Sequence, residues 1–179
     1  MNIFNKIKFC FKDPHKLFNI IKREKIKQSS YFFISLLLPC LILIIIVGRS
    51  YFSNEFKLTL SLGLTEIIIW LLSMILLTII GFLLYFSLIY GFNKLIKGKG
   101  NFEDSIKLVI YSLTPYLLFS WIPVRIVLII ALVYFIKLNF IGGKELMGLS
   151  KWKSVALTTF HYLLILSVSI VFKLVLGEI

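Results

Sequence analysis

The chain has 179 residues, of which 59% are hydrophobic and 16% are charged, with a mean hydropathy of +0.97 and a formal net charge of +12. Soluble domains are about half apolar and roughly a quarter charged, so this composition excludes an ordinary water-soluble fold. Two cysteines and two histidines are too few for a disulfide framework or a metal-ligand cluster, and we expect no cofactor and no metal.

Residues 1–30 are predicted to form a basic amphipathic arm. The Asp13–Pro14 pair is typical of a helix start, and Leu17, Ile20 and Ile21 then share one face of that helix. The other faces carry the basic residues Lys16, Lys22, Arg23 and Lys27. We expect this arm to lie on the cytoplasmic leaflet and to bind anionic lipid, at about 1 kcal/mol per basic residue. Docking of a protein partner is the alternative.

Five apolar runs follow the arm. They span about residues 31–47, 64–91, 105–122, 124–141 and 155–176. A helix needs about 20 apolar residues to cross the bilayer core, and lipid cannot satisfy free backbone groups. No run alternates with period two, which disfavours a membrane barrel. We therefore predict an all-α polytopic membrane protein, with one domain of five transmembrane helices over residues 31–176.

The boundary between the third and fourth runs is short. Trp121 and Pro123 suit a tight turn at the membrane interface. One long kinked helix is the alternative, but it would place Arg125 at mid-bilayer, where a charge is costly.

The basic residues indicate the orientation. Eight Lys and Arg precede the first run, four flank the connection between the second and third, and four flank the connection between the fourth and fifth. Sixteen of twenty therefore fall on one side, which predicts a cytoplasmic N-terminus and an external C-terminus in the cell membrane. Nucleic-acid binding is disfavoured because the basic residues sit in short pieces between apolar runs.

The stretch "KGKGNFEDS" from Lys97 to Ser105 is predicted to be a basic loop that leads into a helix. Asn101 is a good N-cap, and Glu103 and Asp104 oppose the positive end of the helix dipole. Pro115 is expected to bend that helix within the membrane. A phosphate-binding loop is disfavoured because a Walker pattern requires a lysine where Asn101 stands.

Three stretches together resemble the Yip family of five-span membrane proteins. They are "KDPHKLFNIIKREK" before the first run, "NFEDS" with Tyr111 and Pro115 in the third, and "FIGGKELMGLSKWKSVAL" before the fifth. The resemblance implies a helical membrane domain with a cytoplasmic N-terminus. The acidic-aromatic "DLYGP" segment of eukaryotic members, which act with Rab-type GTPases, is missing, which points to the prokaryotic branch.

Two ionisable residues in the apolar runs are candidates for chemistry. His161 in the fifth run is either a proton relay or a histidine hydrogen-bonded to a neighbouring helix, and the second reading is favoured. Glu66 at the start of the second run is expected to cap its helix or to pair with Arg49 or Arg125. One carboxylate makes a poor cation site.

These observations predict a non-enzymatic membrane protein that acts through lipid contacts, a membrane-protein partner or its own copies. The alternative is a small transporter or permease subunit that uses Glu66 and His161. The polar or helix-packing candidates are His161, Glu66, Tyr111, Pro115, Glu103 and Asp104.

Overall fold

The computed structural model describes residues 2–51, 64–119, 122 and 125–175. The side chains of residues 40–51 and most of those of residues 64–78 lie outside the description, as do those of Arg125 and of residues 168–169 and 171–175. All regular secondary structure among the described residues is helical, and they contain no strand. The helices are α1 (Ile3–Lys12), α2 (Pro14–Ile21), α3 (Ile26–Tyr51), α5 (Leu64–Leu95), α6 (Phe102–Phe119), α7 (Arg125–Glu145) and α8 (Lys151–Val175).

The main part of each of the five apolar runs lies in a helix of its own within the described residues, as the sequence predicts. The third and fourth runs form two helices, because α6 ends at Phe119 and α7 begins at Arg125. The two helices then pack against each other along their lengths, so one kinked helix is wrong. Pro115 lies buried within α6, one turn before that helix ends.

The N-terminus of α6 shows why the chain enters a helix at this point. The backbone N–H of Asp104 donates to Asn101 Oδ1 at 2.8 Å, and the backbone N–H of Asn101 donates to Asp104 Oδ2 at 3.0 Å. This reciprocal arrangement satisfies two backbone donors that would otherwise lack partners. Glu103 lies exposed in the same first turn. The predicted cap is confirmed.

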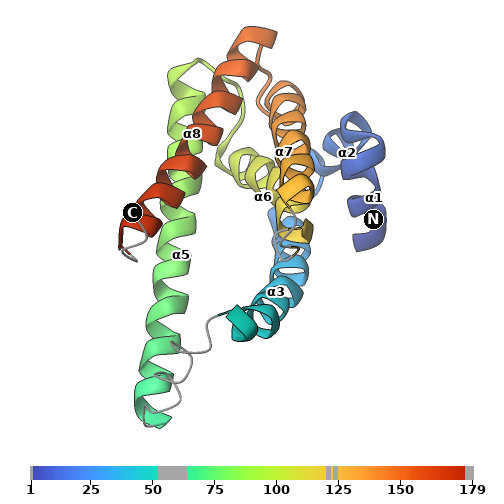
Figure 1. The fold of residues 1–179 in the computed structure, drawn as a ribbon. Coiled ribbons are helices and arrows are strands. Elements are labelled where there is room, and N and C mark those ends of the chain that lie inside the picture. Colours follow the sequence, from blue (N-terminus) through green and yellow to red (C-terminus); the bar gives the residue numbers. More distant parts are fainter. Residues whose placement is uncertain (1, 52–63, 120–121, 123–124, 176–179) are drawn as a thin grey trace.

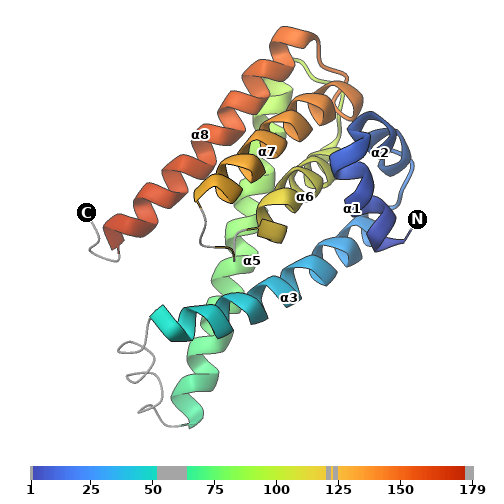
Figure 2. The ribbon, with the colours of Figure 1, turned by 45° about the vertical axis from the view of Figure 1, so that its right-hand side comes forward.

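Helix α6 occupies the centre of the bundle (Figures 1 and 2). It contacts α1, α3, α5 and α7, while α7 also contacts α2 and α8. Consequently α6 buries a continuous series of side chains from Leu108 to Ser112, all at most 2% exposed. The core lies at this level, between α6 and the helices around it.

The outward faces of the long helices are apolar. Exposed large hydrophobic side chains recur on α5 at Leu72, Leu76, Ile79, Ile80, Leu83, Leu84 and Leu88, on α7 at Ile126, Ile129, Ile130, Val133 and Ile136, and on α8 at Leu163, Leu166 and Ile170. Soluble proteins rarely expose such contiguous apolar surface. Among the described residues, Ile126–Glu145 of α7 is long and apolar enough to cross a membrane. The bundle therefore has the surface of a membrane protein.

One end of the bundle gathers three segments that are distant in sequence. Helix α2, the loop 96–101 and the loop 146–150 lie at this end, which we call the arm end, whereas α1 lies alongside α6 (Figure 1). The two loops are joined by a hydrogen bond from the Lys99 backbone N–H to the Met147 carbonyl at 2.8 Å. The arm end thus includes all three stretches that carry the family resemblance.

The arm differs from its prediction in what its apolar face contacts. Leu17, Phe18 and Ile21 of α2 are fully buried, and α2 packs on α7 while α1 packs on α6. Two of the three residues of the predicted apolar face, Leu17 and Ile21, are therefore packed against protein rather than exposed to lipid. The physical reason is that an amphipathic pattern specifies an apolar neighbour, and here protein side chains supply it.

Candidate functional site

A buried ion pair joins the arm to the centre of the bundle. Lys6 Nζ of α1 donates to Glu24 Oε2 at 2.6 Å and to the Tyr111 hydroxyl of α6 at 2.8 Å. The Tyr111 hydroxyl in turn donates to Glu24 Oε2 at 3.2 Å. Because the Lys6 and Glu24 side chains are only 4% and 10% exposed, each charge depends on the other for stabilisation.

Aromatic rings enclose this ion pair. The Phe32 ring of α3 stacks on the Tyr111 ring with centroids 4.8 Å apart. Lys6 Nζ lies 5.4 Å from the Phe32 ring centroid and 5.5 Å from that of Tyr111, within reach of a cation–π attraction. The cluster therefore links α1, α3, α6 and the segment after α2.

The neighbouring Cys10 is not a reactive group. Its side chain is fully buried, and burial raises the pKa of the thiol to about 12. The thiolate is the nucleophilic form, so Cys10 behaves as a small apolar side chain at neutral pH.

The basic loop of the arm end wraps around a buried asparagine. Asn93 Nδ2 at the end of α5 donates to the Gly100 carbonyl at 3.2 Å, and the Gly98 backbone N–H donates to the Asn93 carbonyl at 2.8 Å. A Cβ atom at Gly98 would lie 1.8 Å from Asn93 Oδ1, so only glycine fits there. The glycines of "KGKG" thus serve close packing.

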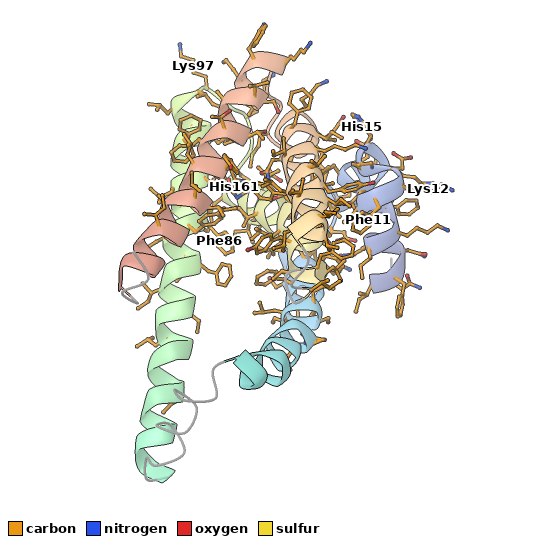
Figure 3. The ribbon with its side chains drawn as sticks, in the orientation of Figure 1. Phe11, Lys12, His15, Phe86, Lys97 and His161 are labelled. Atoms are coloured by element: carbon orange, nitrogen blue, oxygen red, sulfur yellow. The ribbon has the colours of Figure 1, made fainter. Side chains whose placement is uncertain are left out.

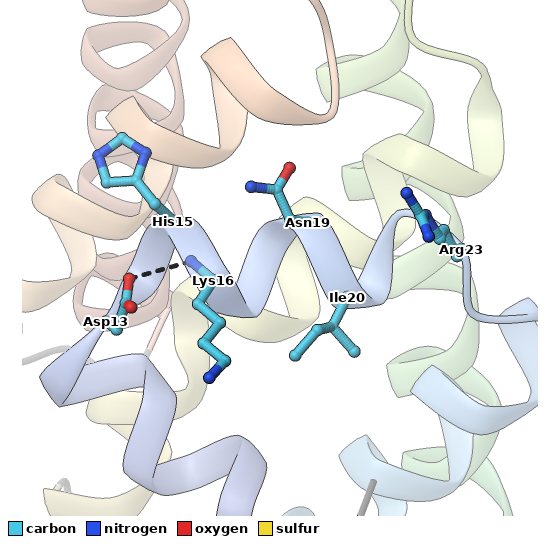
Figure 4. Close-up of a pocket in the computed structure, with 6 residues that line it drawn as sticks. All are labelled: Asp13, His15, Lys16, Asn19, Ile20 and Arg23. Atoms are coloured by element: carbon cyan, nitrogen blue, oxygen red, sulfur yellow. Dashed lines mark hydrogen bonds between the residues drawn. The ribbon is translucent and has the colours of Figure 1, made fainter.

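A groove of about 640 Å³ opens on the exposed side of α2 (Figure 4). Its lining consists of Asp13, His15, Lys16, Asn19, Ile20 and Arg23. The Asp13 carboxylate already accepts the Lys16 backbone N–H at 3.0 Å and caps α2, which confirms the predicted helix start. The Lys16 and Arg23 side chains are exposed, and neither pairs with a carboxylate among the described residues. The groove is therefore a basic surface suited to an anion.

His15, which lines this groove, also contacts the last residue of α7. Its Nδ1 lies 3.0 Å from Glu145 Oε1, although both side chains are partly exposed. The other two predicted lipid-binding residues, Lys22 and Lys27, are also exposed, with Lys27 Nζ 5.8 Å from the Tyr31 ring centroid.

His161 lies fully buried between three helices (Figure 3). Its Nδ1 is hydrogen-bonded to Asn139 Oδ1 of α7, and its ring contacts the Tyr85 ring of α5 and the Phe135 ring of α7. Asn139 Nδ2 donates to the Phe135 carbonyl at 3.0 Å. This arrangement is the inter-helix hydrogen bond favoured from the sequence. His161 Nε2 and the Tyr85 hydroxyl are buried without a hydrogen-bond partner among the described residues.

The remaining candidates separate into different environments. Tyr111 is part of the buried ion-pair cluster, whereas His161 belongs to a second cluster that contains Tyr85 and Asn139. Glu66 falls within α5, but its side chain and those of Arg49 and Arg125 lie outside the described residues.

Sequence reasoning missed Lys6, Glu24 and Asn139. The partners in each contact are 18 to 105 residues apart along the chain, so no local motif marks them. One indication of Asn139 was available in the sequence, because an amide side chain within an apolar run needs a hydrogen-bond partner inside the membrane.

Comparison with known proteins agrees with this architecture. The family model of the Yip1 domain matches residues 10–172. No curated protein and no solved structure matches the chain in the corresponding comparisons. The matched region begins within α1 and ends within α8, and so includes the arm end and all five long helices. The chain therefore belongs to the Yip1 domain family of membrane proteins.

Proposed function

We propose that this chain is a non-enzymatic, five-span protein of a prokaryotic cell membrane, which acts through contacts between its cytoplasmic arm end and anionic lipid headgroups. In this topology α3, α5, α6, α7 and α8 cross the bilayer, the N-terminus is cytoplasmic and the C-terminus is external. The distribution of basic residues supports the orientation. Sixteen of the twenty Lys and Arg either precede the first apolar run or flank the α5–α6 and α7–α8 connections.

One observation supports the contact between the arm and anionic lipid. Leu17, Phe18 and Ile21 of the arm are buried in the bundle, while Lys16 and Arg23 of the same arm remain exposed beside a groove. The packing holds the basic residues on a helix that is fixed to the membrane domain. Basic residues near an anionic surface each contribute about 1 kcal/mol of attraction, which falls as salt rises.

The orientation predicts which side of the membrane reaches Lys99. With Cys40 replaced by alanine, a cysteine at Lys99 is expected to react with an impermeant maleimide in inverted vesicles and to stay unlabelled in intact cells. Cys10 remains in place because its buried thiol does not compete. Strong labelling of the Lys99→Cys variant from outside intact cells would exclude the proposed orientation.

The lipid contact is tested with a fluorophore on a cysteine at Asn19, which lines the groove. In proteoliposomes, a quencher on the headgroup of phosphatidylglycerol is expected to quench this fluorophore more than the same quencher on phosphatidylcholine. The preference should decline with salt, and Lys16→Gln/Arg23→Gln should reduce it, because about 1 kcal/mol is lost per removed charge.

A matched variant controls for net charge. Lys8→Gln/Lys12→Gln removes the same number of charges from exposed positions of α1. It is expected to keep most of the preference. Equal quenching by both lipids in the unmodified arm, or equal loss in both double variants, would count against a contact at this groove.

A transport function has one observation in its favour, namely that the buried Tyr85 hydroxyl and His161 Nε2 have no hydrogen-bond partner within the part of the chain that the structure describes. If His161 relays protons, a proton-coupled flux in liposomes should disappear in His161→Gln, because glutamine does not titrate. We expect no such flux. His161→Gln should keep the fold, since its amide can still bond Asn139, and His161→Leu should lower stability by about 0.6 kcal/mol.

A further inference from the structure

A second groove lies on the membrane-facing side of the bundle, between α7 and α8. It has a volume of about 420 Å³, and its walls include the apolar side chains of Val133, Ile136, Phe140 and Val155. The two helices lie side by side (Figure 2). The volume and composition of this groove suit a hydrocarbon chain.

One charged residue, Lys137, lines the same groove. It is exposed, its Nζ lies 5.7 Å from the Tyr134 ring centroid, and no carboxylate pairs with it among the described residues. Lys137 lies eight residues before the end of α7 at Glu145, or about 12 Å at the helical rise per residue. A lysine on the lipid-facing side of a spanning helix is costly unless an anion neutralises it or its side chain reaches the interface.

The neighbouring helix α8 indicates the level of the membrane–water interface. Ser154 Oγ donates to the Phe140 carbonyl at 2.5 Å, which sets this part of α8 level with Phe140 of α7. Trp152, two residues earlier in α8, is 79% exposed. Exposed tryptophans favour the headgroup level of a bilayer, so Lys137 lies somewhat below that level. The flexible stem of Lys137 can extend toward it.

We propose that this groove holds one anionic phospholipid, with an acyl chain against Val133, Ile136, Phe140 and Val155 and with its phosphate on the Lys137 ammonium. Thr158 and the exposed Thr159 complete the lining on α8. The inference rests on the proposed topology, which places this end of α7 at the cytoplasmic leaflet, but not on the lipid contact of the arm.

The charge on Lys137 also favours an anionic lipid over a second copy of the chain in this groove. A second copy of the chain, docked on this groove through a twofold axis, would bring Lys137 of each copy toward the other. Like charges in a low-dielectric medium repel strongly, whereas a lipid phosphate supplies the missing counter-charge. An anionic lipid therefore fits the groove better than another copy.

Native mass spectrometry of the full chain tests this inference. The protein is purified from nanodiscs that contain equal amounts of phosphatidylglycerol and phosphatidylcholine with the same acyl chains. It is expected to retain the anionic lipid preferentially. Lys137→Gln should reduce the ratio of anionic to neutral retained lipid about fivefold, as expected for one basic residue, while Lys137→Arg should preserve it. Val155→Trp, which fills the groove, should reduce retention of both lipids.

The variant Lys8→Gln/Lys12→Gln serves as the matched control, because it removes two charges from exposed positions outside both grooves, and it should retain lipid as the unmodified protein does. The inference is separable from the arm contact, because Lys137→Gln should leave the quenching of the fluorophore at Asn19 unchanged. Equal retention of the two lipids by the unmodified protein would overturn the proposal, as would an unchanged ratio in Lys137→Gln. A dimer that dissociates in Val155→Trp without any change in lipid retention would assign the groove to a second copy instead.

Discussion

Replacing Glu24 by leucine is expected to loosen the arm from the bundle and to lower stability by about 3–5 kcal/mol. The substitution leaves the Lys6 ammonium buried with no carboxylate and with the Tyr111 hydroxyl as its remaining hydrogen-bond partner among the described residues, and an uncompensated buried charge is strongly destabilising. Hydrogen exchange of the α1 and α2 amides should accelerate more than that of α6, because the arm is the element that the ion pair attaches. Thermal unfolding in detergent gives the overall loss.

The double variant Lys6→Met/Glu24→Leu separates charge from packing. It removes both charges at similar side-chain volume, a change that is often neutral or stabilising in buried pairs, so it should regain most of the stability that Glu24→Leu loses. The exposed pair of His15 and Glu145 provides the matched control, because Glu145→Gln should cost about 0–1 kcal/mol. A double variant as unstable as Glu24→Leu would show that the ion pair itself does not attach the arm.

The helices were predictable because their signals are local. Asp13 before Pro14 and Asn101 three residues before Asp104 are capping patterns within one turn of the chain, and both caps are present. Apolar runs likewise require only neighbouring residues to be recognised. The alternation of those runs with basic segments also predicted that the loop 96–101 and the loop 146–150 share an end with the arm, as they do.

The environment of each apolar face was not predictable. Leu17 and Ile21 form an apolar stripe whether they meet lipid or protein, and the sequence does not distinguish the two. The same limit applies to the charged residues. Lys6 resembles the seven other basic residues of the arm, yet it alone pairs with Glu24 and Tyr111 in the described structure. That difference arises from tertiary contacts across 105 residues, which no local pattern encodes.

Gly142 is the position where a single added side chain should most disturb the joint between arm and bundle. A Cβ atom there would lie 2.4 Å from Leu108 Cδ1 of α6 and 2.8 Å from Phe18 Cζ of α2. Gly142→Val must therefore displace the Leu108 and Phe18 side chains or the helices that carry them, and overpacking of this kind costs typically about 1–3 kcal/mol. Thermal unfolding in detergent should show the loss, and exchange at the α2 amides should show that the arm moves first.

Gly91 on α5 offers the matched control, since a Cβ atom there would meet nothing within 4 Å and the residue is exposed. Gly91→Val should be close to neutral, because valine is slightly better than glycine in a helix interior and contacts no neighbour. If both variants lost the same stability, the effect would belong to valine in a helix rather than to the Gly142 contact. A larger loss confined to Gly142→Val, with faster exchange in α2, would show that the close approach of Phe18 and Leu108 holds the arm in place.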